Sequence, residues 1–527
     1  MKQRESAVRG AAVLAASGLL IRLSGLVYQV PLANWLGAEG IGLYRMALPA
    51  FWAFYRLALG GVPTAVSTLV AEYDGRGRSH VSEQVFQLGM VWIAVSSAVA
   101  SAALALGAGL VARLVGDPRT ELVLVALSPA IYFFSIQQGY GAYLQGRQRI
   151  TPWGVAGLIE QGGRIAGALV GVIALRPRGL AWGAAGAALG NLAGGVLSLL
   201  YLALTYRRVR RRPRARWDPG EPLHKLVGQM ARLAWPLMLS AAVLPLLNLL
   251  DVAVIQRGLQ RGGLSPAEAT ALYGQYSGMA YVLATMPSVF ALAFGHALLP
   301  VVAAARARGD WERVRSRCLV ALRAMALLGL PSALGMAVLA VPLMTATFGM
   351  PEAARLLVWS APIALLNPLM VVAAAALQGL GLTGPPVRNL TAALVLKVVL
   401  DAAVSGIPGS GIYAVVAGSA LSYALTAWLN VRTLERHLDW SVPWSRVLLR
   451  PLLASLVMAA GVGILLAGGW VPRGPWGQIG MALVVAPPLY ALGLAFTGAL
   501  GREDLYEIAG PALRRLERFE WLERILH

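Results

Sequence analysis

Residues 85–112 read VFQLGMVWIAVSSAVASAALALGAGLVA, a run without a single charged side chain. A helix rises about 1.5 Å per residue, so a run of this length crosses the roughly 30 Å hydrocarbon core of a bilayer. Backbone polar groups find no water in that core, and a helix satisfies them within a single segment. The stretch therefore predicts a transmembrane helix.

Similar runs recur along the whole chain of 527 residues. Hydrophobic residues make up 57% and charged residues 13%, and the mean hydropathy is +0.65, whereas soluble domains carry about 25% charged residues. Segments of about ten residues with alternating polarity, typical of a membrane β-barrel, do not occur. We expect an all-α polytopic membrane protein with about 14 transmembrane helices. The expected spans are residues 10–36, 41–71, 85–115, 121–146, 152–175, 180–206, 226–255, 270–303, 314–347, 353–380, 387–404, 412–431, 447–468 and 477–497. The second and eighth are long enough to be tilted or broken.

The net charge of +21 does not indicate nucleic-acid binding, because the basic residues are spread over short loops between spans. With both termini in the cytoplasm, about 30 Lys and Arg lie inside and about 8 outside, as the positive-inside rule requires. The arginines are expected to contact anionic membrane lipids. The first apolar stretch contains Arg22 and continues to about Leu36, which predicts an uncleaved first span rather than a signal peptide.

The two halves of the chain repeat. One constant shift along the sequence aligns Gly116 with Gly349, and Pro118 with Pro351. The same shift pairs Leu144, Gln145 and Gly146 with Leu377, Gln378 and Gly379, and Arg164 with Lys397. Six spans and one cytoplasmic linker form the repeat unit, so both copies point the same way and a central site is expected between them.

The domain organisation follows from this repeat. We expect an N-terminal six-helix lobe (1–206), a basic cytoplasmic linker (207–226), a C-terminal six-helix lobe (227–434), two further transmembrane helices (435–500) and an amphipathic cytoplasmic tail helix (501–527). The tail has apolar residues at helical spacing, so it is expected to lie at the membrane surface or to pack on cytoplasmic loops.

Signatures of enzymes are missing. The five histidines have no spacing typical of a metal site, and Cys318 is the single cysteine, so neither a disulfide framework nor a thiolate metal site is expected. Gly379, Gly381 and Gly384 fit a dinucleotide-binding pattern, but they lie between two spans and no strand precedes them. We therefore expect no catalytic residues, no metal and no cofactor.

Charged residues inside the spans are the candidate functional residues. A charge at the bilayer centre costs at least about 2.5–3.5 kcal/mol, so it usually faces a polar cavity or a partner. Glu160 with Arg164, and Lys397 with Asp401, stand at i and i+4, so these four are either structural ion pairs or cavity charges. Asp251 is a further cavity charge and a candidate for ion coupling.

The first two spans hold three arginines, Arg22, Arg45 and Arg56, with no acid nearby except Glu39. Three cations facing one cavity suit a diphosphate, because guanidinium groups bind phosphate oxygens through paired, charge-assisted hydrogen bonds. We therefore expect these arginines to bind the substrate.

Several motifs resemble one known family. They are IRLSGLVY (21–28), LGAEGIGLY (36–44), GVP (61–63), LVAEY (69–73), NLLD (248–251) and LYGQYSGM (272–279). Essentially the whole chain is similar to stage V sporulation protein B and related polysaccharide-biosynthesis proteins. These belong to the superfamily of multidrug, oligosaccharidyl-lipid and polysaccharide exporters, which includes the MurJ-type lipid II flippases.

The resemblance implies two six-helix lobes around a cationic cavity, two extra helices that form a groove for a lipid tail, and alternating access. Arg22 and Arg56 fall on the family's arginine motifs. One departure concerns the eighth helix, where MurJ-type proteins place an arginine shortly before a proline, because residues 278–286 before Pro287 contain none. Arg257 or Arg45 is expected to substitute.

We therefore expect a monomeric transporter that flips an undecaprenyl-diphosphate-linked sugar, lipid II or a related polysaccharide intermediate, across the cytoplasmic membrane. Na⁺ or H⁺ is the expected coupling ion if a gradient drives transport. The alternative within the superfamily is a multidrug or organic-cation antiporter, whose cavity should be acidic. A membrane glycosyltransferase or polymerase is a third possibility, but it would need a catalytic carboxylate on a sizeable outer loop.

Overall fold

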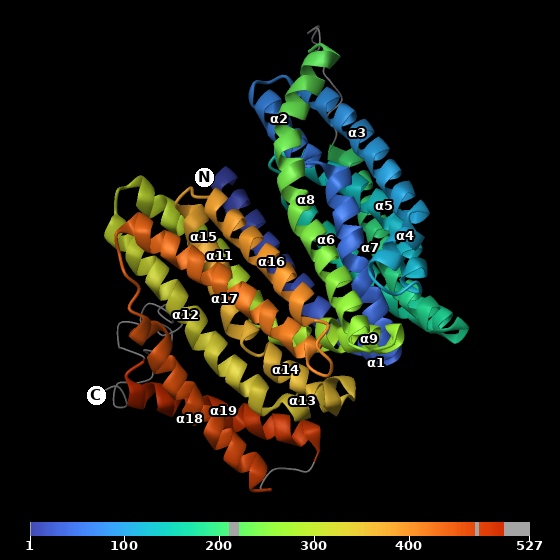
Figure 1. Ribbon diagram of the computed structural model, residues 1–527. Helices are drawn as coiled ribbons and strands as arrows, with labels where there is room; N and C mark the ends of the chain where they lie inside the picture. Colours follow the sequence, from blue (N-terminus) through green and yellow to red (C-terminus); the bar gives the residue numbers. More distant parts are fainter. Residues whose placement is uncertain (1, 210–220, 470–473, 500–527) are drawn as a thin grey trace. The chain divides into compact units, whose positions relative to one another are not determined.

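A computed structural model describes residues 2–209, 221–469 and 474–499. Helices make up every regular element within these ranges (Figure 1), so the expected all-α polytopic fold is confirmed. Most of the linker 207–226 and the tail helix 501–527 lie outside the described residues. The chain divides into two compact units, the first comprising residues 1–279 and 398–415, the second 280–397 and 416–527.

The first unit holds the N-terminal helices and the beginning of the second repeat. Its elements are α1 (Lys2–Leu59), α2 (Val62–Gly75), α3 (Ser79–Leu106), α4 (Ala108–Leu114), α5 (Thr120–Gly146), α6 (Thr151–Leu175), the 3₁₀ turn η1 (Arg176–Arg178), α7 (Leu180–Val209), α8 (Leu223–Arg261), α9 (Pro266–Gly274) and most of the π-helix η2 (Gln275–Ala280). Helix α1 packs against α5, α6, α7, α8 and α9.

The second unit holds the remaining helices. They are α10 (Tyr281–Ala284), α11 (Ser288–Ala307), α12 (Trp311–Val338), α13 (Ala340–Phe348), η3 (Pro351–Ala353), α14 (Ala354–Ser360), α15 (Ile363–Gly379), η4 (Ser445–Leu449), α18 (Arg450–Ala467) and α19 (Pro475–Thr497), with most of α16 (Gly384–Val404) and of α17 (Gly411–Leu438). Its core lies where α11, α12, α15 and α17 meet, around residues such as Val302, Met325 and Leu377.

Twelve helices in the described ranges are long and apolar enough to cross a membrane. The count is below 14 for two physical reasons. The first two expected spans run into each other through α1 and α2, and α16 carries three charges, Arg388, Lys397 and Asp401. The helices therefore agree with about 14 crossings.

The second and eighth expected spans are broken, as their length suggested. The second is interrupted between α1 and α2, where Gly60 and Gly61 have φ of 52° and 77°. The eighth is divided by η2 and by the turn before α11. Helix α1 also bends at Gly37, whose φ of 69° and ψ of −179° place it outside helical geometry, a conformation that glycine adopts with little cost.

The helix boundaries follow the internal repeat. Helix α5 ends at Gly146 and α15 at Gly379, while α6 begins at Thr151 and α16 at Gly384, so both pairs of helix ends are related by the shift that aligns the two sequences. The left-handed residues recur at the same offset, since Gly116 has φ of 91° and Gly349 has φ of 66°, while Gln148 has φ of 58° and Gly381 has φ of 74°. The two copies thus share helix ends as well as sequence.

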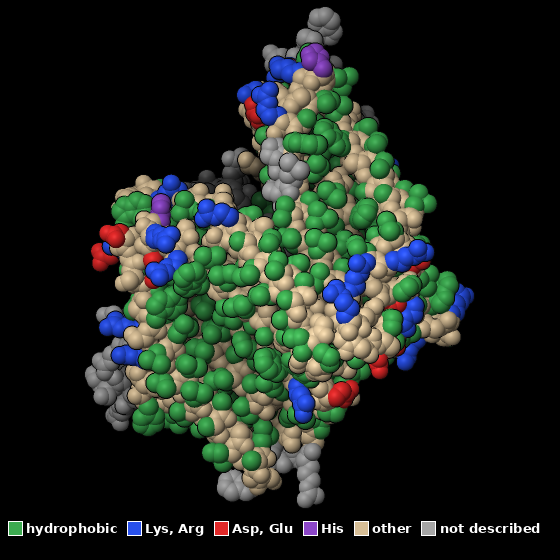
Figure 2. All heavy atoms as spheres, in the orientation of Figure 1, with side chains coloured by type: hydrophobic (Ala, Val, Ile, Leu, Met, Phe, Trp, Pro, Cys, Tyr) green, Lys and Arg blue, Asp and Glu red, His purple; other side chains and the backbone are tan. Residues whose placement is uncertain are grey.

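The outer surface is that of a membrane protein. Figure 2 shows broad hydrophobic areas along the helices, with Lys and Arg gathered in small groups. On α3, Val91, Val95 and Val99 are 64%, 61% and 64% exposed, and their i, i+4, i+8 spacing places them on one face. A stripe of exposed valines of this kind is suited to contact with lipid.

Candidate functional site

Helix α1 contributes a group of polar side chains to the interior of the first unit. Tyr28, Gln29 and Tyr44 are buried, and the Tyr44 hydroxyl accepts a hydrogen bond from Asn191 of α7 at 3.2 Å. Arg45 follows directly and is half-buried. Arg45 and Arg164, from α1 and α6, both lie within electrostatic range of the Tyr28 hydroxyl.

Helices α5 and α6 add amides and charges to the same region. Gln137 of α5 donates to the Glu160 carboxylate at 2.6 Å, and Arg164 donates to Gln161. Glu160 and Arg164 interact electrostatically, but the hydrogen bonds of each go to a glutamine. Arg164 therefore keeps most of its guanidinium for other contacts.

Two guanidinium groups in this region are incompletely satisfied. The Nε atoms of Arg45 and Arg164 are buried and have no hydrogen-bond partner among the described residues. A buried charged donor without an acceptor is costly. A bound anion is one group that would supply such an acceptor.

Close packing of α6 on α7 fixes the position of Glu160 and Arg164. A Cβ added at Gly194 of α7 would lie 2.4 Å from the Glu160 carbonyl oxygen, and one at Gly190 would lie 2.5 Å from the Arg164 carbonyl oxygen. Small residues at i and i+4 allow such close helix contact. The glycines thus allow close packing, and this packing fixes the position of the polar face of α6.

Arg56 stands near the end of α1. Its side chain is exposed, and its guanidinium lies over the ring of the buried Tyr55, 5.9 Å from the centroid. The Tyr55 hydroxyl lies within electrostatic range of both Arg56 and Glu160. Arg56 therefore belongs to the neighbourhood of Glu160.

Arg22 lies in α1, and its side chain is outside the described part of the structure. The backbone around it runs beside α6, because a Cβ at Gly157 would lie 3.0 Å from Ile21, and a Cβ at Gly25 would lie 3.3 Å from Gln161. This stretch of α1 is thus next to the helix that carries Glu160 and Arg164.

The other predicted site residues lie on α8 and α16. Arg257 is exposed near the end of α8, and Asp251 is half-buried earlier in the same helix. Lys397 and Asp401 are 7% and 0% exposed on α16. Electrostatic interactions therefore link Arg45 and Arg164 to Tyr28, Arg164 to Glu160, and Arg56 and Glu160 to Tyr55. The functional roles of all the predicted site residues stay predictions.

The sequence did not reveal the uncharged members of this neighbourhood. The sequence does contain a signal for them, because they are polar residues within apolar spans. They are Tyr28, Tyr44, Gln137, Gln161 and Asn191. A prediction based on charged residues alone does not include them. No group of three or more His, Cys, Asp or Glu side chains suited to a metal ion occurs in the described ranges.

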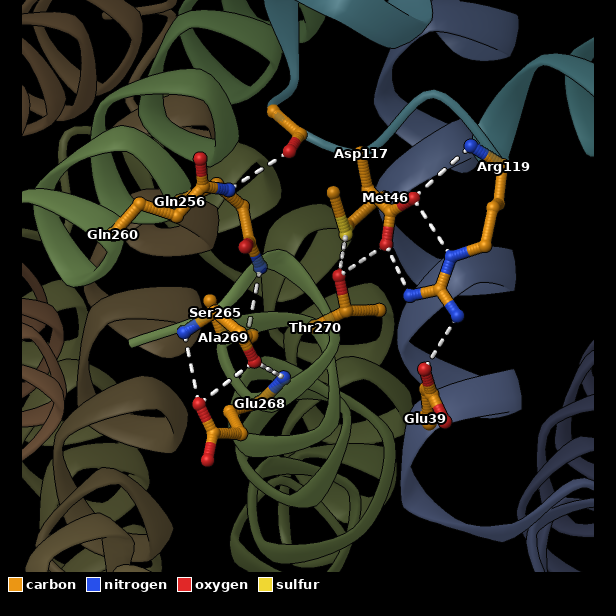
Figure 3. A network of polar contacts seen from close by, with 11 residues as sticks. Glu39, Met46, Asp117, Arg119, Gln256, Gln260, Ser265, Glu268, Ala269 and Thr270 are labelled. Atoms are coloured by element: carbon orange, nitrogen blue, oxygen red, sulfur yellow. Dashed lines mark hydrogen bonds and ion pairs between the residues drawn. The ribbon is translucent and has the colours of Figure 1, made fainter. Parts of the chain in front are cut away.

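A second polar network, also unpredicted, joins α1, the 115–119 loop, α8 and α9 (Figure 3). Its centre is Asp117, which is 1% exposed. Arg119 pairs with Asp117 through two nitrogen atoms, at 3.0 and 2.7 Å, and with Glu39 at 2.5 Å. Glu39, the acid nearest to Arg45 in sequence, is thus engaged by Arg119.

A third cluster lies where α2, α3, α5 and α7 meet. Asp74 accepts from Ser82 at 2.7 Å and pairs with Arg147 at 2.7 Å. The buried Glu83 accepts hydrogen bonds from Tyr143 and Tyr206. The rings of Phe86, Tyr143 and Tyr206 pack against one another, so aromatic packing and hydrogen bonds hold this cluster together.

Comparison with known proteins agrees with this architecture. Residues 7–305 match the family model described as polysaccharide biosynthesis protein. The chain is 27% identical over 445 residues to stage V sporulation protein B of Bacillus subtilis (strain 168), covering 83% of this chain and 85% of that protein. It is 25% identical over 484 residues to the lipid II flippase MurJ of the same organism, covering 87% of each.

Among solved structures, one similar fold is that of the lipid II flippase MurJ in an inward closed conformation. The TM-score is 0.70 at 14% sequence identity, and the match covers 92% of this chain and 98% of that one. At this identity the likeness concerns the fold alone.

Proposed function

This chain belongs to the polysaccharide biosynthesis protein family, within the multidrug, oligosaccharidyl-lipid and polysaccharide exporter superfamily, and we propose that it flips a polyprenyl-diphosphate-linked sugar across the cytoplasmic membrane by alternating access. It is a multi-pass membrane transporter of the flippase type. The substrate proposed is lipid II or a related undecaprenyl-diphosphate-linked intermediate of polysaccharide synthesis.

The observation that carries the proposal is the pair of unsatisfied guanidinium groups inside the first unit. Arg45 and Arg164 each bury an Nε–H that has no acceptor in the described part of the chain. Phosphate oxygens accept such hydrogen bonds in pairs, with a geometry that matches the guanidinium fork. A diphosphate bound there would satisfy both arginines.

The neighbouring groups suit the same ligand. The buried amide nitrogen of Gln161 has no hydrogen-bond partner among the described residues and could donate to such a ligand. Glu160, a carboxylate that the described residues place in this neighbourhood, already accepts from Gln137 at 2.6 Å. Arg56 adds a cation near Tyr55. This balance of charge favours an anionic headgroup over an organic cation, and thus favours the flippase over the multidrug antiporter.

Flipping requires the headgroup to be bound from one leaflet and released to the other. In parallel-repeat transporters this occurs when two halves rock around a central site. We include in the proposal that Asp251, Lys397 and Asp401 take part in ion coupling or in ion pairs that change during the cycle, with Na⁺ or H⁺ as the coupled ion. The cytoplasmic location of both termini and the monomeric state remain parts of the proposal.

The decisive experiment measures flipping of a fluorescent polyprenyl-diphosphate sugar in proteoliposomes by wild type and by Arg164→Ala. We expect at least a tenfold loss, because a charge-assisted hydrogen bond contributes about 1.5–3 kcal/mol. Arg355→Ala, which removes an exposed arginine from α14, is the matched control and should keep full activity.

Normal flipping by Arg164→Ala, at equal amounts of folded protein, would remove the phosphate role of this arginine. Transport of an organic cation such as ethidium by the wild type, with no flipping of the lipid-linked sugar, would identify the antiporter instead. The two substrates are measured in the same vesicles, so the two functions are separated directly.

A further inference from the structure

The network around Asp117 connects the two repeats within the first unit. Asp117 belongs to the loop between α4 and α5, in the first repeat. Thr270 of α9, at the beginning of the second repeat, donates its hydroxyl to the Asp117 carboxylate at 2.8 Å. Thr270 and Asp117 are 0% and 1% exposed, so this hydrogen bond to a carboxylate is shielded from water.

Arg119 holds the carboxylate in position. Its side chain and its backbone N–H all donate to Asp117, at 2.7 to 3.0 Å, and its remaining nitrogen contacts Glu39 near the bend in α1. Hydrogen bonding to Asp117 outweighs burial, which acts in the opposite direction, and raises the pKa of the Arg119 guanidinium. The guanidinium is therefore held in its charged form, and the Asp117 carboxylate is oriented toward α9.

The helices on both sides of this hydrogen bond are in close contact. A Cβ at Gly42 of α1 would lie 2.1 Å from the Thr270 carbonyl oxygen, and one at Gly274 of α9 would lie 1.9 Å from the Ala38 carbonyl oxygen. Gln260 of α8 donates to the Gly116 carbonyl oxygen at 2.8 Å. Several contacts thus join the first repeat to α8 and α9 at one end of the unit.

The carboxylate is present in one repeat only. The shift that superposes the helix ends places Met350 at the position of Asp117, between Gly349 and Pro351. A methionine cannot accept the Thr270 type of hydrogen bond with comparable strength, because its thioether is a weak acceptor. If the fold of this loop required a carboxylate, both copies would carry one. The carboxylate of Asp117 therefore serves a role that is specific to the first repeat.

We propose that Asp117, oriented by Arg119, and Thr270 form a latch that keeps this end of the first unit closed and that opens during the transport cycle. Alternating access requires the end of one repeat to separate from the start of the other. Opening would break the buried, charge-assisted Thr270–Asp117 hydrogen bond, the Thr270–Met46 and Gln260–Gly116 contacts and the packing of α1 on α9. The Asp117–Arg119–Glu39 group would stay intact on its own side. The latch rests on the alternating-access part of the proposed function and is independent of which substrate is carried.

The test uses Thr270→Val, which keeps the size of the side chain and removes the donor. The reporter is Ile41→Cys in a Cys318→Ala background, because Ile41 is 0% exposed and lies against Gly278 of η2, whose added Cβ would be 2.1 Å from it. The rate of maleimide alkylation is measured in proteoliposomes. We expect it to rise about tenfold in Thr270→Val, the factor that corresponds to loss of one hydrogen bond to a charged group.

The controls separate latch opening from general loosening. Thr270→Ser keeps the hydroxyl and should restore the wild-type rate. Ser265→Ala removes an exposed capping hydrogen bond at the start of the same helix and should leave the rate unchanged. Should Thr270→Val fail to fold, Gln260→Met breaks the other contact across the junction and replaces it in the test.

Equal alkylation rates in Thr270→Val and Thr270→Ser would overturn the latch, with or without a change in melting temperature. Alkylation does not depend on the cargo. A raised rate together with no flipping of the polyprenyl-diphosphate sugar by the wild type would therefore support the latch and reject the proposed substrate, so the two failures are distinguishable.

Discussion

The backbones of Gly171 and Gly186 approach so closely that a Cβ on either residue would lie 2.2 Å from the carbonyl oxygen of the other. Gly167 with Gly190 and Gly163 with Gly194 continue this contact along α6 and α7. The two helices are therefore held together by backbone contact over several turns. Because α6 carries Glu160, Gln161 and Arg164, the glycines also determine where the candidate site lies.

Gly186→Leu should destabilise the protein by more than about 1–3 kcal/mol, the usual cost of overpacking, because the obstacle here is backbone and cannot rotate away. The measurement is the melting temperature in detergent. Gly162→Ala on the same α6 is the matched control, since a Cβ there meets nothing within 4 Å. It should raise stability slightly, because alanine is the better helix former. A fall of equal size in both variants would contradict the packing argument.

Arg56→Ala should abolish flipping while the protein remains folded and inserted, if Arg56 binds the diphosphate. Arg56→Lys keeps the charge but loses the bidentate fork, so partial activity is expected. The measurement is flipping of a labelled polyprenyl-diphosphate sugar, normalised to folded protein. If Arg56 instead neutralises a buried acid, Arg56→Gln and Arg56→Ala should both lower the melting temperature, because the acid is left without its partner. Full activity of the Ala variant would exclude the phosphate role.

Gln137→Leu removes the donor that the Glu160 carboxylate uses. We expect the free energy of unfolding to fall by about 1.5–3 kcal/mol, the contribution of a hydrogen bond to a charged group. Glu160→Gln should lower the free energy of unfolding less in the Gln137→Leu background than in the wild type. In that background the carboxylate has already lost its donor, so replacing it removes an unsatisfied charge. A double-mutant cycle on melting temperatures measures this coupling. Strict additivity of the two changes would show that the pair does not interact.

Glu221, which precedes α8, should make a small pH-dependent contribution to stability. It accepts from Lys225 at 2.7 Å and from Arg78 at 2.6 Å, and these hydrogen bonds, that of Lys225 first, lower its pKa. A carboxyl with a lowered folded-state pKa stabilises the fold above its unfolded pKa of about 4.3. The contribution is lost as the pH falls through the folded value. The difference in melting temperature between wild type and Glu221→Gln should therefore be constant from about pH 6 to 8 and vanish in acid. A difference that grows in acid would have the wrong sign.

The expected topology can be tested without any transport assay. In the Cys318→Ala background, a cysteine placed among residues 207–216 and another at Gly262 should react with a membrane-impermeant maleimide from opposite sides of the membrane. The single helix α8 separates the two positions, so an odd number of crossings lies between them. Labelling from one side would overturn the assignment of spans between the two halves.

The span pattern could be predicted from sequence because the bilayer imposes length and polarity on each helix separately. The breaks at Gly60, Gly61 and η2 also followed, since those spans exceeded the needed length. Glu160 and Arg164 stand one helical turn apart, a spacing that predicts either an ion pair or two cavity charges. The spacing of two residues on one helix does not predict which side chains of other helices will bind them. Gln137 of α5 donates a hydrogen bond to Glu160, and Arg119 forms an ion pair with Glu39. Such partners on other helices are determined by packing rather than by distance along the sequence.

The Thr270–Asp117 contact shows the same limit more strongly. The two residues are 153 positions apart, and neither lies in a pattern that points to the other. Asp117 stands in a loop, where a charged residue needs no explanation, and Thr270 lies at a span end, where a hydroxyl is common. Only the close approach of α1 and α9, which depends on Gly42 and Gly274 lacking side chains, brings them together.

The first unit is discontinuous along the chain, since it comprises residues 1–279 and 398–415, and this determines the order in which the protein can be assembled at the ribosome. A nascent chain that has produced α1 to α7 still lacks α8 and α9, so Asp117 meets no Thr270. The loop at Ser405, whose hydroxyl oxygen would lie 1.8 Å from a Cβ built at Gly258 of α8, is synthesised later still, after α10 to α15. The translocon therefore delivers most helices of the second unit to the membrane before the first is finished. Completion of the first unit is a late step of biogenesis, although most of its residues are made first.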